Sequence, residues 1–291
     1  MTGDSGLRVG VVLPSLTAQR RDGIDLRIAA RHAEGAGLDS VWHGDHLATG
    51  QPSLDLAVGL ATVAAVTERI AIGAGVFVPA IRPLAWAAKQ ITSVQHVSGG
   101  RLILGVGSGG GPEQWAAAGV AYADRGSRTD LALDLLPALL AGEPVRFGDQ
   151  DIVLAPSVTR PPIWVGNASS IAIRRAARVG DGWFPSLVTA RTVAIGAARL
   201  AEMSDAPRAI AVGTTGALGD GMPSRAEIAA RLGASHGVQM NEVPITGGPH
   251  EAAGRMAEFR AAGATHLVMG FADGDWRGQC DLLAETVSLL R

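Results

Sequence analysis

Cysteine, lysine and long apolar runs are scarce in this chain of 291 residues. Cys280 is the only cysteine, which excludes an internal disulfide and a metal cage built from cysteines. Lys89 is the only lysine among 25 basic residues, a compositional habit rather than the mark of a site. No apolar run approaches the roughly 18 residues that a transmembrane helix needs, and no basic, apolar signal sequence opens the chain. We therefore expect a cytoplasmic protein with no membrane partner.

Neither positive nor negative charge is in large excess. The formal net charge is -2 and the isoelectric point is near 6.4, so nothing predicts a nucleic-acid partner. Apolar residues make up 47% and glycines number 39, a composition that suits a well-packed α/β protein. The length allows two small domains or one α/β barrel, since such barrels need about 250 residues.

Eight short apolar runs alternate with stretches of helical spacing along the whole chain. Two of the joints between them share one pattern, HAEGAGLDSVW (residues 32–42) and FRAAGATHLVM (residues 259–269). Repeated βα units predict parallel strands, and eight of them predict one closed (β/α)8 TIM barrel over residues 1–291. The Gly/Pro-rich segments 213–223 and 244–249 are expected to be long barrel loops rather than linkers. The predicted strands are 8–13, 40–42, 70–76, 102–104, 163–165, 182–184, 209–212 and 267–269.

The segment RLILGVGSGGGPEQW (residues 101–115) predicts a strand, a glycine loop and a helix that begins at Pro112. Glycine backbone lets a ligand approach closely, and the free N–H groups of such a loop can face an anion. We interpret the loop as one wall of a cofactor site. Its letters also fit the dinucleotide motif G-x-G-x-x-G, but that motif belongs to a first βαβ unit with an acidic residue about 20 positions later, and this loop follows three earlier strands. A purely structural glycine turn is the other alternative.

The segment His43-Gly44-Asp45-His46, after the second predicted strand, is the densest polar cluster of the chain. The active sites of such barrels form at the carboxyl ends of the strands, which is where this segment falls. The side chains could ligate a metal or belong to an ordinary surface loop. The functional interpretation is that Asp45 orients a ligand or a neighbour while His46 moves a proton, because a histidine titrates near neutral pH.

Asn167-Ala168-Ser169-Ser170, after the fifth predicted strand, has the composition of a helix N-cap. Two interpretations stand: the segment only caps the helix, or its free N–H groups also bind a phosphate, as barrel loops often do. Ser108 lies in GVGSG, which does not match the nucleophile motif G-x-S-x-G, so a serine hydrolase is not predicted.

Five segments in order carry a family resemblance. On them the chain resembles the bacterial luciferase-like flavin oxidoreductases and, within that family, the members that use the deazaflavin coenzyme F420. The resemblance implies a TIM barrel, commonly a homodimer, that holds F420 or FMN at the carboxyl ends of its strands. The segments are GLDSVWHGDHL (37–47), IAIGAGVFVPAIRPL (70–84), GGRLILGVGSGGGPEQWAAAGV (99–120), PPIWVGNASSIAIRRAARVGDGWFP (161–185) and GATHLVMG (263–270).

The same resemblance implies roles for individual residues. Asp45 and His46 match an Asp-His pair beside the cofactor, with His46 as the candidate base. Gly75 and Val76 match a non-prolyl cis peptide that backs the deazaflavin ring, and Val78 stands where a hydroxyl residue is frequent. The residues that match loops around the ribityl chain and the phosphate are Gly107, Ser108, Gly166, Asn167 and Ala168.

Two departures bear on the substrate. The F420-dependent glucose-6-phosphate dehydrogenases have a glutamate at the position of Gly110 and a tryptophan at that of Gly50, so a sugar phosphate is not predicted. The resemblance implies an oxidoreductase that passes a hydride between F420 and a small organic substrate. The alternatives are an FMN-dependent monooxygenase of the same family and a non-catalytic protein that binds flavin.

Overall fold

The computed structural model describes residues 6–236 and 240–291, and its centre is a closed barrel of parallel strands. Pairing runs β1-β2-β3-β4-β7-β8, and β8 pairs with β9, which returns to β1 through β11. The predicted (β/α)8 TIM barrel is therefore confirmed. Its strands are β1 (Arg8–Val12), β2 (Ser40–His43), β3 (Ala71–Phe77), β4 (Leu102–Val106), β7 (Ile163–Gly166), β8 (Gly182–Phe184), β9 (Ala209–Leu218) and β11 (His266–Phe271).

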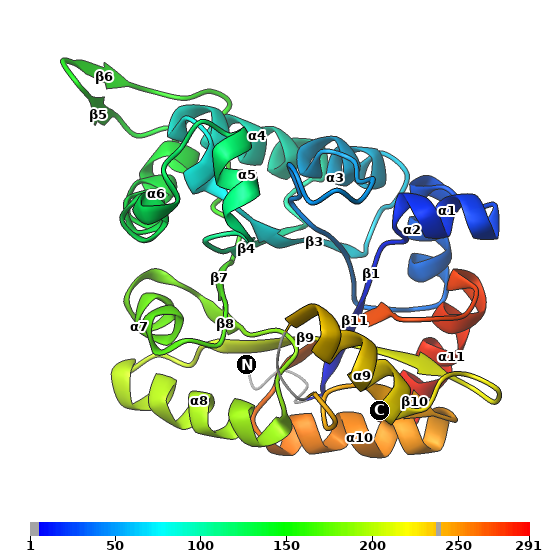
Figure 1. The fold of residues 1–291 in the computed structure, drawn as a ribbon. Coiled ribbons are helices and arrows are strands. Elements are labelled where there is room, and N and C mark those ends of the chain that lie inside the picture. The colour runs from blue at the N-terminus through cyan, green and yellow to red at the C-terminus, as the bar shows by residue number, and fades with distance from the viewer. Residues whose placement is uncertain (1–5, 237–239) are drawn as a thin grey trace.

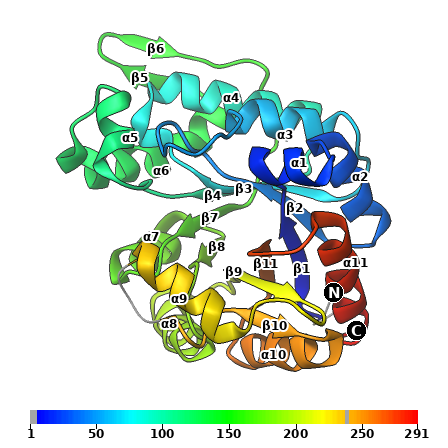
Figure 2. The ribbon, with the colours of Figure 1, turned by 45° about the vertical axis from the view of Figure 1, so that its right-hand side comes forward.

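The helices form a ring outside these strands (Figures 1 and 2). The longer helices pack through small and apolar side chains, as α2 does with Ala29, Ala30 and Ala33. None of the described helices is long and apolar enough to cross a membrane. The helices are α1 (Leu16–Asp22), α2 (Leu26–Gly35), α3 (Leu56–Ala64), η1 (Pro79–Ile81), α4 (Leu84–Val97), α5 (Pro112–Ala117), η2 (Tyr122–Asp124), α6 (Arg125–Ala141), α7 (Ser170–Val179), α8 (Ala190–Met203), α9 (Arg225–His236), α10 (Pro249–Ala261) and α11 (Trp276–Ser288).

The structure differs from the sequence-based prediction in three places. β9 continues to Leu218, and β10 (Ile245–Gly247) pairs with it, so parts of both predicted Gly/Pro-rich loops are strand. Gly216 lies where a Cβ would meet the Ile245 carbonyl oxygen at 1.7 Å, so glycine here permits pairing rather than a turn. The short helix α1 was not predicted. Neither was the hairpin of β5 (Val145–Phe147) and β6 (Gln150–Ile152), which projects beside α4 and α6 in both views.

An aromatic layer fills the barrel interior. The Trp42 and Trp164 rings stack with centroids 5.5 Å apart, and Phe184 lies 5.0 Å from Trp42. Space for these rings comes from glycines on the strands, since a Cβ at Gly73 would lie 2.2 Å from the Trp42 ring. The aromatic layer therefore packs the inside of the barrel. Open space lies between this layer and the carboxyl ends of the strands.

The connections at the amino ends of the strands are held by charged side chains whose hydrogen bonds are satisfied. The Arg101 guanidinium donates to the carbonyl oxygens of Ala64, Thr67, Ile70 and Ser98 and to the Thr67 hydroxyl, at 2.8–3.0 Å. One arginine thereby ties the end of α3, the start of β3 and the end of α4 to β4.

Candidate active site

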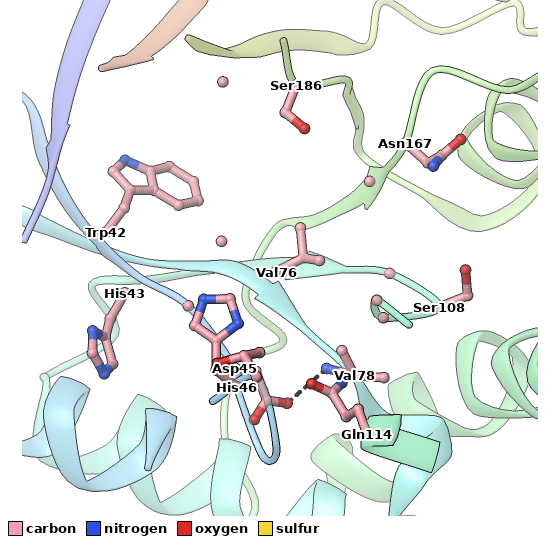
Figure 3. Close-up of a pocket in the computed structure, with 18 of the residues that line it drawn as sticks. Trp42, His43, Asp45, His46, Val76, Val78, Ser108, Gln114, Asn167 and Ser186 are labelled. Atoms are coloured by element: carbon pink, nitrogen blue, oxygen red, sulfur yellow. Dashed lines mark hydrogen bonds between the residues drawn. The ribbon is translucent and has the colours of Figure 1, made fainter. Parts of the chain in front are cut away.

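A cavity of about 850 Å³ opens at the carboxyl ends of the barrel strands, where the sequence predicts the site. Figure 3 shows its polar side chains arriving from separate strands and loops. Nine of the predicted site residues line it: Asp45, His46, Gly75, Val76, Val78, Gly107, Ser108, Gly166 and Asn167. Ala168 does not; it is half-buried between Asn167 and Ser169. The fold therefore brings together residues that are spread over more than 120 positions of the sequence.

The peptide bond between Gly75 and Val76 is cis, as the resemblance implies. The Val76 side chain lies in a recess lined by glycines from two neighbouring strands. A Cβ at Gly107 would lie 2.6 Å from Val76 Cγ2, and a Cβ at Gly105 or Gly166 would lie 3.1 or 2.9 Å from its Cγ1. These glycines therefore make room for Val76, which stands as a fixed apolar support in the cavity wall (Figure 3).

Asp45 lines the cavity but is buried, and both of its carboxylate oxygens are bound by the protein. Its two oxygens accept hydrogen bonds from the Arg82 guanidinium at 2.7 and 2.9 Å, and one also accepts from the Val78 N–H at 2.9 Å. Arg82 in turn lies over the Phe77 ring, 4.7 Å from its centroid. A carboxylate with these partners holds the loop after β2 against the end of β3. Asp45 thus acts as a positioning residue.

His46 is the histidine that reaches the cavity with an exposed side chain. No hydrogen bond involves its ring within the described part of the chain, so both ring nitrogens are available. The ring lies over Gly44, where a Cβ would be 2.5 Å from His46 Nε2. Glycine at position 44 therefore permits this orientation of the ring.

His43 is turned away from His46. Its Nε2 lies 3.3 Å from the Leu54 carbonyl oxygen, and the ring packs where a Cβ of Gly59 on α3 would be 2.7 Å away. Burial lowers the pKa of His43. Figure 3 shows the two imidazole rings apart. The metal interpretation of this cluster has no geometric support, since the described residues contain no group of three side chains placed to hold an ion.

The glycine loop after β4 performs two tasks. Gly107, with Gly105 of β4, accommodates Val76, while Gly109 has a φ of 71° and turns the chain toward α5, which begins at Pro112 as predicted. Gly110 faces open space. The loop belongs to the fourth strand of a closed barrel, so the dinucleotide-binding interpretation of its sequence is wrong.

A second cavity of about 230 Å³ adjoins the first, with Gly107, Ser108, Gly166 and Asn167 shared between them. Ser169 caps α7 by accepting from the Ala172 N–H, and Asn167 Oδ1 accepts from the Ser169 N–H at 2.9 Å. The predicted N-cap is therefore confirmed.

Two arginines line this second cavity beside the start of α7. Arg175 forms an ion pair with Asp130, at 2.6 Å. Arg125 donates to the Tyr122 carbonyl oxygen, and no carboxylate among the described residues pairs with it. A helix start next to an unpaired guanidinium is suited to an anion.

Sequence reasoning missed two residues of this region. Gln114 lines the main cavity from α5, and Arg125 lines the second one from the start of α6. Both lie on helices after the glycine loop. Gln114 falls within the segment 101–115, but the sequence pattern assigns it no role there, and Arg125 lies outside the segments singled out. Only the folded backbone brings them to the ligand space.

Comparison with known proteins gives a consistent result. The family model described as luciferase-like monooxygenase matches residues 9–218. An uncharacterised protein of Mycobacterium tuberculosis is 38% identical over 140 residues, which cover 46% of this chain and 48% of that protein. The F420-dependent glucose-6-phosphate dehydrogenase of Amycolatopsis mediterranei is 33% identical over 174 residues, 55% of this chain and 52% of the enzyme. The chain thus spans about half the length of these curated relatives.

Solved structures match over nearly the full length. An F420-dependent secondary alcohol dehydrogenase in complex with an F420-acetone adduct superposes with a TM-score of 0.82 at 17% identity, covering 98% of this chain and 99% of that one. The monooxygenase RslO1 from Streptomyces bottropensis gives 0.76 at 17% identity, covering 97% and 99%. At this identity the likeness establishes the fold.

Proposed function

Because the chain belongs to the luciferase-like monooxygenase family, we propose that it is an oxidoreductase that transfers a hydride between coenzyme F420 and a small organic substrate. The observation that carries the proposal is the apolar support that Val76 forms in the wall of the main cavity, packed into the recess of Gly105, Gly107 and Gly166. The F420-dependent relative and the structural match to an F420 enzyme add to it.

The residues present fit a deazaflavin with a phosphate-bearing tail. The main cavity, about 850 Å³, lies within the size range of sites for large organic ligands, and Trp42, Val76 and Phe184 give it an apolar wall. The adjoining cavity offers Arg125 and the start of α7 to a phosphate. Gly107, Ser108, Gly166 and Asn167 line both cavities, so a ligand could extend from one into the other.

The protein's contribution is position and proton transfer. When bound, F420 supplies the carbon that accepts or donates the hydride. Val76 would support the ring, and His46 lines the same cavity with both ring nitrogens free of protein partners among the residues that the structure describes. His46 takes the proton that a substrate releases together with the hydride, or returns it in the reverse direction. Asp45 keeps the loop that bears His46 in place through Arg82 and the Val78 N–H.

An FMN-dependent monooxygenase is the second candidate, favoured by the description of the matching family model and by the structural match to RslO1. The same two cavities would hold the isoalloxazine ring and the phosphate of FMN. A flavin monooxygenase consumes oxygen during turnover, whereas an F420-dependent dehydrogenase does not.

Fluorescence titration of the purified protein with F420 and, separately, with FMN tests the proposal. We expect tight binding of F420 and weak binding of FMN. The reverse preference, together with oxygen uptake during turnover, would transfer the protein to the monooxygenase branch. Binding of either cofactor with no turnover over a broad substrate panel would instead identify a non-catalytic flavin-binding protein.

A further inference from the structure

We propose that Gln114 is a substrate-binding residue whose amide nitrogen donates a hydrogen bond to the oxygen of an uncharged carbonyl compound or alcohol. The inference rests on the proposed function and names the substrate class for the same cavity. The sequence assigns no role to Gln114 within the glycine-loop segment; its geometry points to one.

The Gln114 side chain is buried but unsatisfied. Only 4% of the residue is exposed, and it lines the main cavity. Its Nε2 has no hydrogen-bond partner within residues 6–236 and 240–291. A buried donor without an acceptor is unfavourable. Because the Nε2 atom is itself covered, a ligand oxygen reaches it only when the amide turns into the cavity that the residue lines.

The orientation of the amide follows from its other end. Gln114 Oε1 accepts from the Leu47 N–H at 3.4 Å. A flipped amide would face that N–H with a second donor, so Oε1 belongs on the Leu47 side and Nε2 on the other. Nε2 then lies against the glycine loop, 3.0 Å from where a Cβ of Gly109 would be. Glycine at position 109 leaves the space that the donor needs.

The position of the donor relates it to the proposed proton-transfer residue. Leu47, which holds the Gln114 amide, directly follows His46 in the chain. Figure 3 shows Gln114, Asp45 and His46 on the same side of the cavity, below Val76. A substrate oxygen bound by Gln114 would therefore lie on the same side of the cavity as His46.

The charges around the main cavity select an uncharged substrate. Among the residues that line it, Asp45 and Glu113 carry negative charge, and no arginine or lysine is present. Asp45 is already paired with Arg82, whereas Glu113 is exposed. A carboxylate or phosphate on the substrate would find no cation here and would lie near Glu113. A neutral oxygen acceptor needs only the donor that Gln114 offers.

The test measures ligand binding to cofactor-loaded protein by calorimetry, so it needs no turnover. The probes are cyclohexanone and acetophenone, each beside an analogue that carries a carboxylate. We expect the ketones to bind F420-loaded protein and their carboxylate analogues to bind more weakly. Gln114→Leu should weaken ketone binding by about tenfold, the value of one neutral hydrogen bond to a buried acceptor, and leave the dissociation constant of F420 unchanged. Gln150→Leu, on the exposed hairpin strand β6, is the matched control.

A second variant separates ligand binding from support of the loop. Gln114→Glu keeps an acceptor for the Leu47 N–H but loses the donor, so it should bind ketones as poorly as Gln114→Leu. Normal ketone binding by Gln114→Glu would reduce Gln114 to a residue that supports the loop. Tighter binding of the carboxylate analogues, or no ketone binding by wild type, would also overturn the inference. If F420 binds in these cases, the proposed function stands.

If only FMN binds, the same titrations are made with FMN-loaded protein. If neither cofactor binds, both proposals are rejected.

Discussion

The two ends of the barrel treat polar groups in opposite ways. At the amino ends of the strands, Arg101 has all of its donor nitrogens engaged, and Glu34 Oε1 accepts from the N–H groups of Glu68, Arg69 and Ile70 at 2.7–3.0 Å. At the carboxyl ends, Gln114 Nε2 and the His46 ring have no protein partner among the described residues. At the amino end the protein satisfies its own polar groups. At the carboxyl end these two side chains are left without a partner in the described part of the protein.

Two histidines show the same contrast. His266, the first residue of β11, lies against the Trp164 ring with centroids 4.7 Å apart, and burial lowers its pKa to about 4. It is therefore neutral at physiological pH and contributes packing. His46 is exposed in the cavity. The fold thus separates residues that stabilise it from residues that are free to react, and the following variants test that separation.

The largest expected effect is at His46. His46→Ala should lower kcat by roughly two to four orders of magnitude, the usual contribution of a general acid or base, while the dissociation constant of F420 stays the same. Steady-state kinetics and cofactor titration measure the two quantities. His96→Ala, at an exposed histidine on α4, is the control and should change neither. A His46→Ala enzyme with wild-type kcat would remove His46 from the mechanism.

Arg101→Ala should instead lower the stability of the protein and leave F420 binding unchanged. Loss of the guanidinium leaves several buried carbonyl oxygens unpaired, so the free energy of unfolding should fall by about 3 kcal/mol or more. Denaturant unfolding measures it. Arg69→Ala, at an exposed arginine of the same connection, should stay near wild type. If folded Arg101→Ala protein bound F420 markedly worse, the amino end would also be serving the ligand, contrary to the comparison.

Arg125→Ala should weaken F420 binding by about 10- to 100-fold, because a charge-assisted hydrogen bond to a phosphate is lost. The deazaflavin chromophore without its phosphate should bind both proteins equally. Arg174→Ala, at an exposed arginine on α7, is the control for net charge. Equal loss for the two ligands would show that Arg125 does not bind the phosphate.

The smallest effect concerns the recess of Val76. In Gly107→Ala the new methyl group would press on Val76, and the protein should lose about 1–3 kcal/mol of stability. Gly110→Ala should be neutral because Gly110 faces open space and has no positive φ. The double variant with Val76→Ala should regain stability. If it did not, the recess would not explain the glycine at position 107.

The sequence predicted the barrel because each βα unit carries its own local signal, an apolar run followed by helical spacing. The family resemblance, together with the position of these segments at the ends of strands, placed nine cavity residues. The sequence could not predict that Asp45 would be bound by Arg82, or that Gln114 would be left with a free donor. Those facts depend on contacts between segments that only the closed barrel brings together. The strand character of Gly216 was hidden for the same reason, since glycine there serves a close approach of β10 and not a turn.

The stacked pair of Trp42 and Trp164 has an optical consequence. Trp42 is 1% exposed yet lies in the wall of the main cavity, next to the space above Val76. A coloured ring bound there would be within van der Waals reach of an indole that is shielded from water, and energy transfer from the indole to that ring would quench its emission. Tryptophan emission would therefore report whether such a ring occupies the cavity.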